Sequence, residues 1–307
     1  MKSAPLIAIV GPTASGKTAR GVDLARRIGG EIVSADSRQV YRGMDVGTGK
    51  DLADYGTDVP YHLIDVAPAG YRYNLFEYLR DARAAIDDIR GRGRVPVVVG
   101  GTGMYVESLL KGIEMPEVPR NEDLRRRLAS KTLEELTAML AAIRPLHNTT
   151  DTDTPARAMR ALEIEDYYAR NPEEARKARR GCPLDALIVG VDVPRDDRRR
   201  LITARMRRRF DSEDMLGEVR QLVADGVDPE NLIYYGLEYK YLTLHLLGRI
   251  SRQEMEQGLE TAIHQFAKRQ MTWFRGMERR GFTIRWLPYD LAPAEFTDRV
   301  VELWKAL

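Results

Sequence analysis

The chain has 307 residues, of which 43% are apolar, and its 48 basic and 46 acidic residues give a formal net charge of +2. This much apolar surface excludes a chain that is disordered throughout, because its burial can offset the entropy lost on folding. The single cysteine, Cys182, excludes an internal disulfide and a cysteine-rich metal site, and it indicates a reducing, cytoplasmic setting.

Short apolar runs alternate with helical patterns along the first hundred residues. The runs are rich in Val and Ile and bounded by Gly or Pro, which predicts buried parallel strands over 6–10, 31–35, 61–66 and 95–100, with later strands over 186–193 and 283–287. Between them, apolar spacing predicts helices over 17–28 and 74–92. This alternation predicts an α/β fold built on a doubly wound parallel sheet.

The strand rhythm stops between residues 100 and 186, a gap far longer than an ordinary crossover. Thr132 and Glu135 form a candidate capping box before a helix over 133–143, and Pro155 fits the first turn of a helix over 155–169. We therefore expect an inserted helical domain over 115–183, within a core domain formed by 1–114 and 184–307.

The last third of the core is again helical. Ser251 and Glu254 form a candidate capping box at the start of a long helix that ends near residue 276. The last strand and a final helix over 293–306 follow it. No apolar run reaches the roughly 20 residues of a membrane span, so we expect no membrane partner.

A glycine-rich loop follows the first predicted strand and opens the first predicted helix. It matches the pattern G-x-x-x-x-G-K-[ST] with Gly11, Pro12, Thr13, Ala14, Ser15, Gly16, Lys17 and Thr18. In such a P-loop, backbone N–H groups turn toward phosphate oxygens, the Lys17 ammonium lies beside them, and the Thr18 hydroxyl suits Mg²⁺. The fold is therefore predicted to be P-loop NTPase-like. The absence of an Asn-Lys-x-Asp guanine reader and of an Asp-Glu strand end counts against a GTPase and a mechanical ATPase.

Asp36 follows the second predicted strand. Carboxyl ends of parallel strands share one edge of the sheet, so Asp36 should face Lys17 and Thr18. Its carboxylate could hold Mg²⁺, act as a general base or cap a turn, and the sequence alone leaves these roles open. Thr102 follows the fourth strand and adds a hydroxyl at the same edge.

Basic residues cluster in three predicted helical segments. Eight arginines lie between residues 195 and 209, and a second cluster, which includes Lys268 and Arg275, runs from Lys268 to Arg285 and is interleaved with aromatic residues. A third cluster lies in the insertion and includes Arg157 and Arg160. Basic faces with aromatic neighbours are typical of RNA binding. Solvated faces with intrahelical ion pairs are the more common outcome, so both interpretations remain open.

Five blocks of the sequence resemble the bacterial tRNA dimethylallyltransferases. They lie at residues 11–18, 36–48, 99–105, 157–163 and 266–275, in the family's order. The block Asp-Ser-Arg-Gln-Val-Tyr-Arg-Gly-Met-Asp-Val-Gly-Thr is far more specific than the P-loop alone. The resemblance implies a Mg²⁺-dependent transferase of tRNA modification. It would move a dimethylallyl group from dimethylallyl diphosphate to N6 of the adenosine on the 3′ side of the anticodon, releasing diphosphate.

The resemblance also implies roles for individual residues. The P-loop would bind the donor diphosphate with Thr18 on Mg²⁺, Asp36 would be the general base, and Lys17 and Arg209 would stabilise the leaving diphosphate. The tRNA contacts implied are Asp36, Ser37, Arg38, Gln39, Thr102, Arg157, Arg160, Lys268 and Arg275. The partners would be the tRNA anticodon stem-loop, gripped by the insertion, and the prenyl diphosphate, and we expect a monomer.

One departure from the family pattern is Gly236-Leu237-Glu238, where Gly-Tyr-Arg is common. A small-molecule or nucleoside kinase is the alternative function, with Asp36 acting on a hydroxyl group and the insertion serving as a lid. A third reading is an RNA-binding protein without enzymatic activity, against which the intact Lys17, Thr18 and Asp36 argue.

Overall fold

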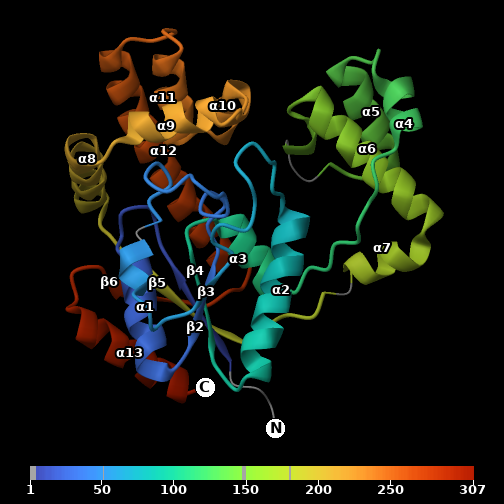
Figure 1. Ribbon diagram of the computed structural model, residues 1–307. Coiled ribbons are helices and arrows are strands. Elements are labelled where there is room, and N and C mark those ends of the chain that lie inside the picture. Colours follow the sequence, from blue (N-terminus) through green and yellow to red (C-terminus); the bar gives the residue numbers. More distant parts are fainter. Residues whose placement is uncertain (1–4, 51, 147–149, 180) are drawn as a thin grey trace. The chain divides into compact units, whose positions relative to one another are not determined.

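The computed structural model in Figure 1 describes residues 5–50, 52–146, 150–179 and 181–307. The chain forms two compact units, an α/β unit within Met1–Lys111 and Pro183–Leu307 and a helical unit within Gly112–Cys182. Among the described residues, every helix is too short or too polar to cross a membrane.

Six parallel strands form one sheet in the α/β unit, in the order β3-β2-β4-β1-β5-β6. The strands are β1 (Leu6–Val10), β2 (Glu31–Ser34), β3 (Tyr61–His62), β4 (Pro96–Gly100), β5 (Ala186–Asp192) and β6 (Ile284–Pro288). In the centre, Ile7 of β1 pairs with Val97 on one side and Leu187 on the other. All of β1 is buried, which explains its continuous apolar run and confirms the predicted doubly wound sheet.

The third strand is shorter than the predicted 61–66. Only Tyr61 and His62 pair with β2, because Leu63 and Asp65 adopt left-handed backbone conformations with φ of 65° and 57°. Such conformations turn the chain out of an extended strand. The β propensity of the segment could not reveal this turn.

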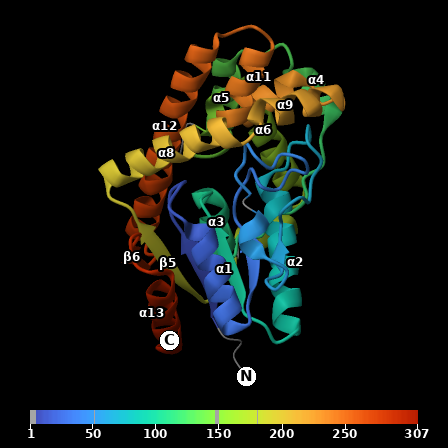
Figure 2. The ribbon, with the colours of Figure 1, turned by 60° about the vertical axis from the view of Figure 1, so that its left-hand side comes forward.

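Helices make up most of the rest of the α/β unit. They are α1 (Lys17–Ile28), α2 (Leu75–Gly91), α3 (Gly103–Leu110), α8 (Arg195–Ser212), α9 (Met215–Ala224), α10 (Pro229–Tyr235), α11 (Leu237–Leu246), α12 (Arg252–Arg279) and α13 (Pro293–Lys305), with a 3₁₀ turn η1 (Leu52–Tyr55). Helices α1 and α13 pack together on one face, whereas α2, α3 and part of α12 lie on the other (Figure 1). Figure 2 shows α12 running from the level of the sheet past α8 to α11.

Capping boxes begin three of the predicted helices. Ser251 and Glu254 cap the start of α12, and Asn74 and Glu77 do the same for α2. Each box satisfies backbone N–H groups that a helix start leaves without partners, which is why the predicted Ser251–Glu254 box located the start of α12. The Asn74–Glu77 box was not predicted.

The helical unit consists of α4 (Glu122–Leu128), α5 (Leu133–Ile143), η2 (Thr150–Thr152), α6 (Pro155–Arg170) and α7 (Pro172–Arg179). The predicted Thr132–Glu135 capping box is present at the start of α5. Leu136 and Leu140 of α5 pack against Leu162 of α6 in a core of this unit's own.

Candidate active site at the P-loop

The P-loop leaves β1 at Val10 and enters α1 at Lys17. Ala14 and Gly16 have left-handed backbone conformations, with φ of 61° and 72°, and this turns successive N–H groups inward as an anion-binding nest requires. Lys17 Nζ lies 3.4 Å from the Pro12 carbonyl oxygen, so its side chain folds back over the loop. The buried Ser15 hydroxyl has no hydrogen-bond partner among the described residues. A buried hydroxyl without a partner destabilises the fold, and a ligand oxygen bound in the loop would remove this penalty.

Gln270 of α12 holds the P-loop against the end of β4. Its Oε1 accepts the Thr13 N–H at 2.8 Å, and its Nε2 donates to the Gly101 carbonyl at 2.9 Å. The side chain is buried. Sequence reasoning did not assign Gln270 to the site, and its position inside the 266–275 block is the signal that could have found it.

Asp36 lies half-buried directly after β2, close to Thr102 after β4. Asp36 Oδ1 accepts the Arg38 N–H at 2.9 Å, and Thr102 Oγ1 accepts the Ser37 N–H at 3.0 Å. The turn-capping role expected of Asp36 therefore exists. It fixes the orientation of the carboxylate, which lines the same cavities as Lys17.

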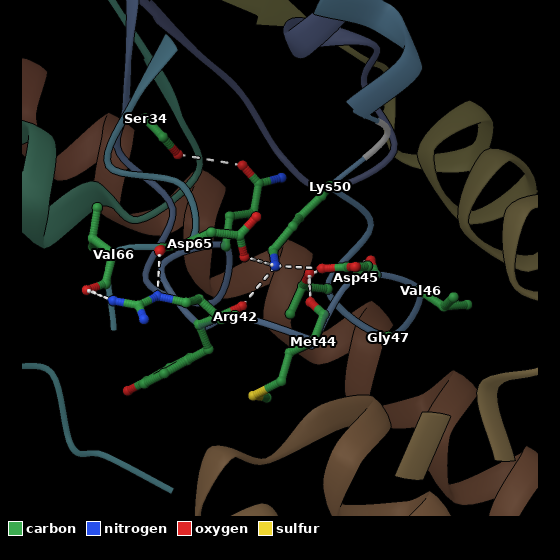
Figure 3. A network of polar contacts seen from close by, with 12 residues as sticks. Ser34, Arg42, Met44, Asp45, Val46, Gly47, Lys50, Asp65 and Val66 are labelled. Carbon is green, nitrogen blue, oxygen red and sulfur yellow. Dashed lines mark hydrogen bonds and ion pairs between the residues drawn. The ribbon is translucent and has the colours of Figure 1, made fainter. Parts of the chain in front are cut away.

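The segment after Asp36 is held by a buried lysine, drawn in Figure 3. Lys50, only 1% exposed, donates to Asp45 Oδ1 at 2.5 Å, to the Tyr41 carbonyl at 2.6 Å and to Asp65. Gln39, expected at the tRNA contact, is buried and donates to the Gly49 carbonyl at 3.3 Å.

Two adjoining cavities meet at Thr13, Lys17, Asp36 and Arg205. The phosphate cavity follows the P-loop from Thr13 to Ala19. The second, which we name the apolar cavity, has walls from α8, α9, α11 and α12 that include Ile202, Met206, Met215, Leu237, Leu259, Ile263 and Phe266. This arrangement can hold a phosphorylated group and an apolar group side by side.

Arg205 and Arg209, one helical turn apart on α8, supply positive charge at this junction. Arg209 is 6% exposed, and its Nε lies 3.7 Å from Glu213 Oε2. Gly49 has a left-handed φ of 65°, and a Cβ there would overlap the terminal nitrogens of both arginines. These guanidinium groups therefore rest directly on the Gly49 backbone.

Glu238 is a carboxylate of the apolar cavity that sequence reasoning did not assign to the site. Burial raises its pKa, and the nearby Arg209, Arg38 and Arg205 oppose this rise only in part. The signal that could have found it is the departure Gly236-Leu237-Glu238. The site thus contains a second carboxylate in addition to Asp36.

Arg157 and Arg160 lie on α6 of the helical unit. Arg157 is exposed and forms an ion pair with Asp153 at 2.5 Å. Arg160 donates to Glu163 at 3.1 Å and to the Val118 carbonyl at 2.9 Å. Arg160 therefore stabilises the helical unit through these bonds, in addition to any contact with tRNA.

Glu163 is the buried centre of this ion cluster. Arg125 donates to both of its carboxylate oxygens, at 2.6 and 2.7 Å, and the Asn121 N–H donates at 3.0 Å. Burial alone would raise its pKa, but these hydrogen bonds and that from Arg160 lower the pKa of Glu163 to about 2.

Lys268 and Arg275 are exposed on α12. Burial lowers the pKa of Arg198 on α8, and the positive charge of Arg275 lowers it further. The α8 and α12 basic clusters therefore come together in space, although they are far apart in the sequence.

The residues at the P-loop fit a magnesium ion bound together with phosphate groups. Thr18, Asp36 and Asp54 place oxygen atoms around the phosphate cavity. Within the described ranges, no three His, Cys, Asp or Glu side chains form a metal cage. Mg²⁺ commonly needs no such cage, because it keeps several waters and takes one or two protein oxygens together with substrate phosphates.

Comparisons with known proteins place this site in a family. Residues 39–277 match the model of the family described as IPP transferase, and residues 4–56 match that of isopentenyl transferase. The chain is 58% identical to a tRNA dimethylallyltransferase of Bacteroides fragilis, over 94% of each chain. It is 55% identical to one of Porphyromonas gingivalis, over 98% of this chain and 99% of the relative.

A solved structure leads to the same family. The crystal structure of a tRNA isopentenylpyrophosphate transferase from Bacillus halodurans is 30% identical, with a TM-score of 0.71, and the match covers 99% of this chain and 97% of that one. The family model alone spans more than half of the chain. The chain belongs to the IPP transferase family.

Proposed function

We propose that the chain is a tRNA dimethylallyltransferase. It transfers a dimethylallyl group from dimethylallyl diphosphate to N6 of the adenosine on the 3′ side of the anticodon, and it releases diphosphate. The observation that carries this proposal is the junction of the phosphate cavity with the apolar cavity beside Asp36. A prenyl diphosphate consists of a diphosphate joined to an apolar prenyl group, and these two parts match the two adjoining cavities.

The apolar cavity favours prenyl transfer over the alternative kinase. A prenyl group makes no hydrogen bonds and needs apolar walls, such as those from Ile202, Leu259 and Phe266. A small hydroxylated acceptor has no apolar group that would fill the space between these walls.

The proposed reaction breaks the bond between the prenyl C1 and the diphosphate oxygen and forms a bond between C1 and the adenine N6. Charge develops on the leaving diphosphate, where Lys17, Arg209 and the P-loop N–H groups stabilise it. Mg²⁺ held near Thr18 would neutralise part of the diphosphate charge. Asp36 accepts the N6 proton as the nitrogen becomes acidic on bonding to carbon.

The exocyclic amine is a weak nucleophile, so positioning supplies much of the rate. The adenine has to leave its stack to reach the donor. We assign the tRNA contacts to Ser37, Arg38, Gln39, Thr102, Lys268 and Arg275 of the α/β unit and to Arg157 and Arg160 of the helical unit, which would grip the anticodon stem-loop. The enzyme would act as a monomer.

The test is to incubate the protein with radiolabelled dimethylallyl diphosphate, Mg²⁺ and an unmodified tRNA carrying adenosine 3′ of its anticodon. We expect label in the tRNA and release of diphosphate, with neither when Mg²⁺ is chelated. The matched control is the same tRNA with guanosine at that position, which should stay unlabelled.

A parallel incubation with γ-labelled ATP and a panel of nucleosides tests the alternative. Phosphorylated nucleoside without labelled tRNA would replace the proposed function by that of a kinase.

A further inference from the structure

The backbone over residues 45–49, which we name the wall, lines the active-site cavities and also contacts residues of helices α9 and α11. Gly47 and Thr48 line the apolar cavity, and Thr48 and Gly49 line the phosphate cavity. Any shift of this wall changes the shape of the donor site, so the contacts that fix it bear on the reaction.

Glu218 of α9 binds this wall through three backbone N–H groups. Its Oε2 accepts the N–H groups of Asp45 and Val46 at 2.7 Å each, and its Oε1 accepts that of Gly47 at 3.1 Å. Hydrogen bonds to a carboxylate are stronger than neutral ones, and three successive donors fix both the position and the orientation of the segment.

Tyr239 of α11 holds the other side of this carboxylate. Its hydroxyl donates to Glu218 Oε1, and its ring is 2% exposed. Burial raises the pKa of Tyr239 and the Glu218 charge raises it further, so the hydroxyl stays protonated as a donor. The ring packs on Gly47 so closely that a Cβ there would lie 2.8 Å from ring carbons.

Two sets of contacts fix the C-terminal end of the wall. Lys50, which directly follows it, is buried and bonds to Asp45, Asp65 and the Tyr41 carbonyl (Figure 3). The guanidinium groups of Arg205 and Arg209 rest on the backbone of Gly49, the last residue of the wall. The chain thus carries a continuous set of contacts from Glu218 through the wall to the two arginines.

We propose that Glu218, held by Tyr239, is a positioning residue that seats Arg205 and Arg209 toward the diphosphate by fixing the backbone of residues 45–49. The effect of Glu218 on prenyl transfer rests on the proposed function. Its effect on the positions of Arg205 and Arg209 requires only that the P-loop site binds a diphosphate.

A double-mutant cycle tests the proposal with inorganic diphosphate and Mg²⁺ as the probe. Glu218→Gln keeps the size of the side chain but turns an amide N–H₂ toward the wall's donors. We expect it to weaken diphosphate binding about tenfold, measured by calorimetry. In the Arg209→Gln background the same substitution should change binding by less than about twofold, because the group it positions is gone.

The prenyl transfer rate provides the second readout. Glu218→Gln should lower kcat and leave the KM for tRNA unchanged, and Tyr239→Phe should show the same pattern to a smaller extent. The matched control is Glu256→Gln on α12, an exposed i,i+4 partner of Arg252, which should change neither quantity. If Glu218→Gln does not fold by circular dichroism, Tyr239→Phe takes its place in the cycle.

Equal effects of Glu218→Gln in the wild-type and Arg209→Gln backgrounds would overturn the proposal, as would wild-type diphosphate affinity in Glu218→Gln. A wild-type protein that binds diphosphate but does not prenylate tRNA would instead refute the proposed function, and the binding cycle would still decide the role of Glu218.

Discussion

The arginines of α8 and those of the helical unit both form basic clusters in the sequence, but their surroundings in the structure differ. Arg205 and Arg209 line the cavities beside the P-loop and rest on Gly49. Arg125 and Arg160 converge on the buried Glu163. The comparison teaches that a run of arginines becomes a candidate anion site where a cavity meets it, and a structural cluster where a buried carboxylate does.

The reason lies in the cost of burying charge. A buried carboxylate needs partners, and Arg125 and Arg160 supply them in the helical unit. At the P-loop the cations outnumber the carboxylates, which leaves net positive charge for a phosphorylated ligand. The four predictions below test this contrast.

The largest effect is expected at Asp36, the carboxylate that lines the cavities beside the P-loop. Asp36→Ala should lower the prenyl transfer rate about 10³- to 10⁴-fold, because the N6 proton loses its acceptor. Binding of dimethylallyl diphosphate, measured by calorimetry, should stay within a few-fold of wild type.

The control for Asp36 is Asp58→Ala, which removes an exposed aspartate paired with Arg26. An equal loss of donor affinity in Asp36→Ala would show that Asp36 serves mainly as a metal or structural ligand.

Arg209→Lys should lower kcat about 10²-fold, since a lysine keeps the charge but lacks the fork of a guanidinium. Single-turnover assays with saturating donor measure this loss. Arg207→Lys, on the same helix and exposed, is the matched control and should retain the wild-type rate. An unchanged rate in Arg209→Lys would remove that residue from the leaving-group site.

Glu163→Gln should destabilise the helical unit by about 2–3 kcal/mol at pH 7, because two arginines lose their buried partner. The pKa of Glu163 in the folded protein, about 2, lies below its ordinary value of 4.5. Its ionised form therefore contributes stability above pH 4.5, and this contribution is lost as the pH falls toward 2.

Urea unfolding of the wild type and Glu163→Gln at pH 7 and pH 3 checks this prediction. The difference between the two proteins should shrink at pH 3. A difference that does not depend on pH would mean that packing, and not ionisation, accounts for the loss.

The smallest effect is expected at Arg157, an exposed arginine of the helical unit. Arg157→Ala should change the free energy of unfolding by less than about 0.5 kcal/mol, because an exposed ion pair contributes little. If Arg157 contacts tRNA, the slope of log affinity against log salt should fall by about one unit. Filter binding over a salt series measures the slope, and an unchanged slope would exclude the contact.

Local patterns predicted much of the fold. The buried strands β1 and β4, the P-loop between β1 and α1, and the capping boxes at Thr132 and Ser251 all depend on residues close together in the chain. Their periodicity and hydrogen-bond chemistry act over a few residues, so a sequence can display them. The shortened β3 escaped prediction because its end depends on the conformations of Leu63 and Asp65.

The sequence by itself determined which functional groups are present: a phosphate-binding loop, a carboxylate at a strand end and clusters of arginines. Tertiary structure decided which of these groups meet. Gln270 bonds to Thr13 across 257 positions of the chain, and Glu218 to Asp45 across 173. Such contacts leave no local pattern, because they depend on where the packing of helices and strands brings distant backbone groups together.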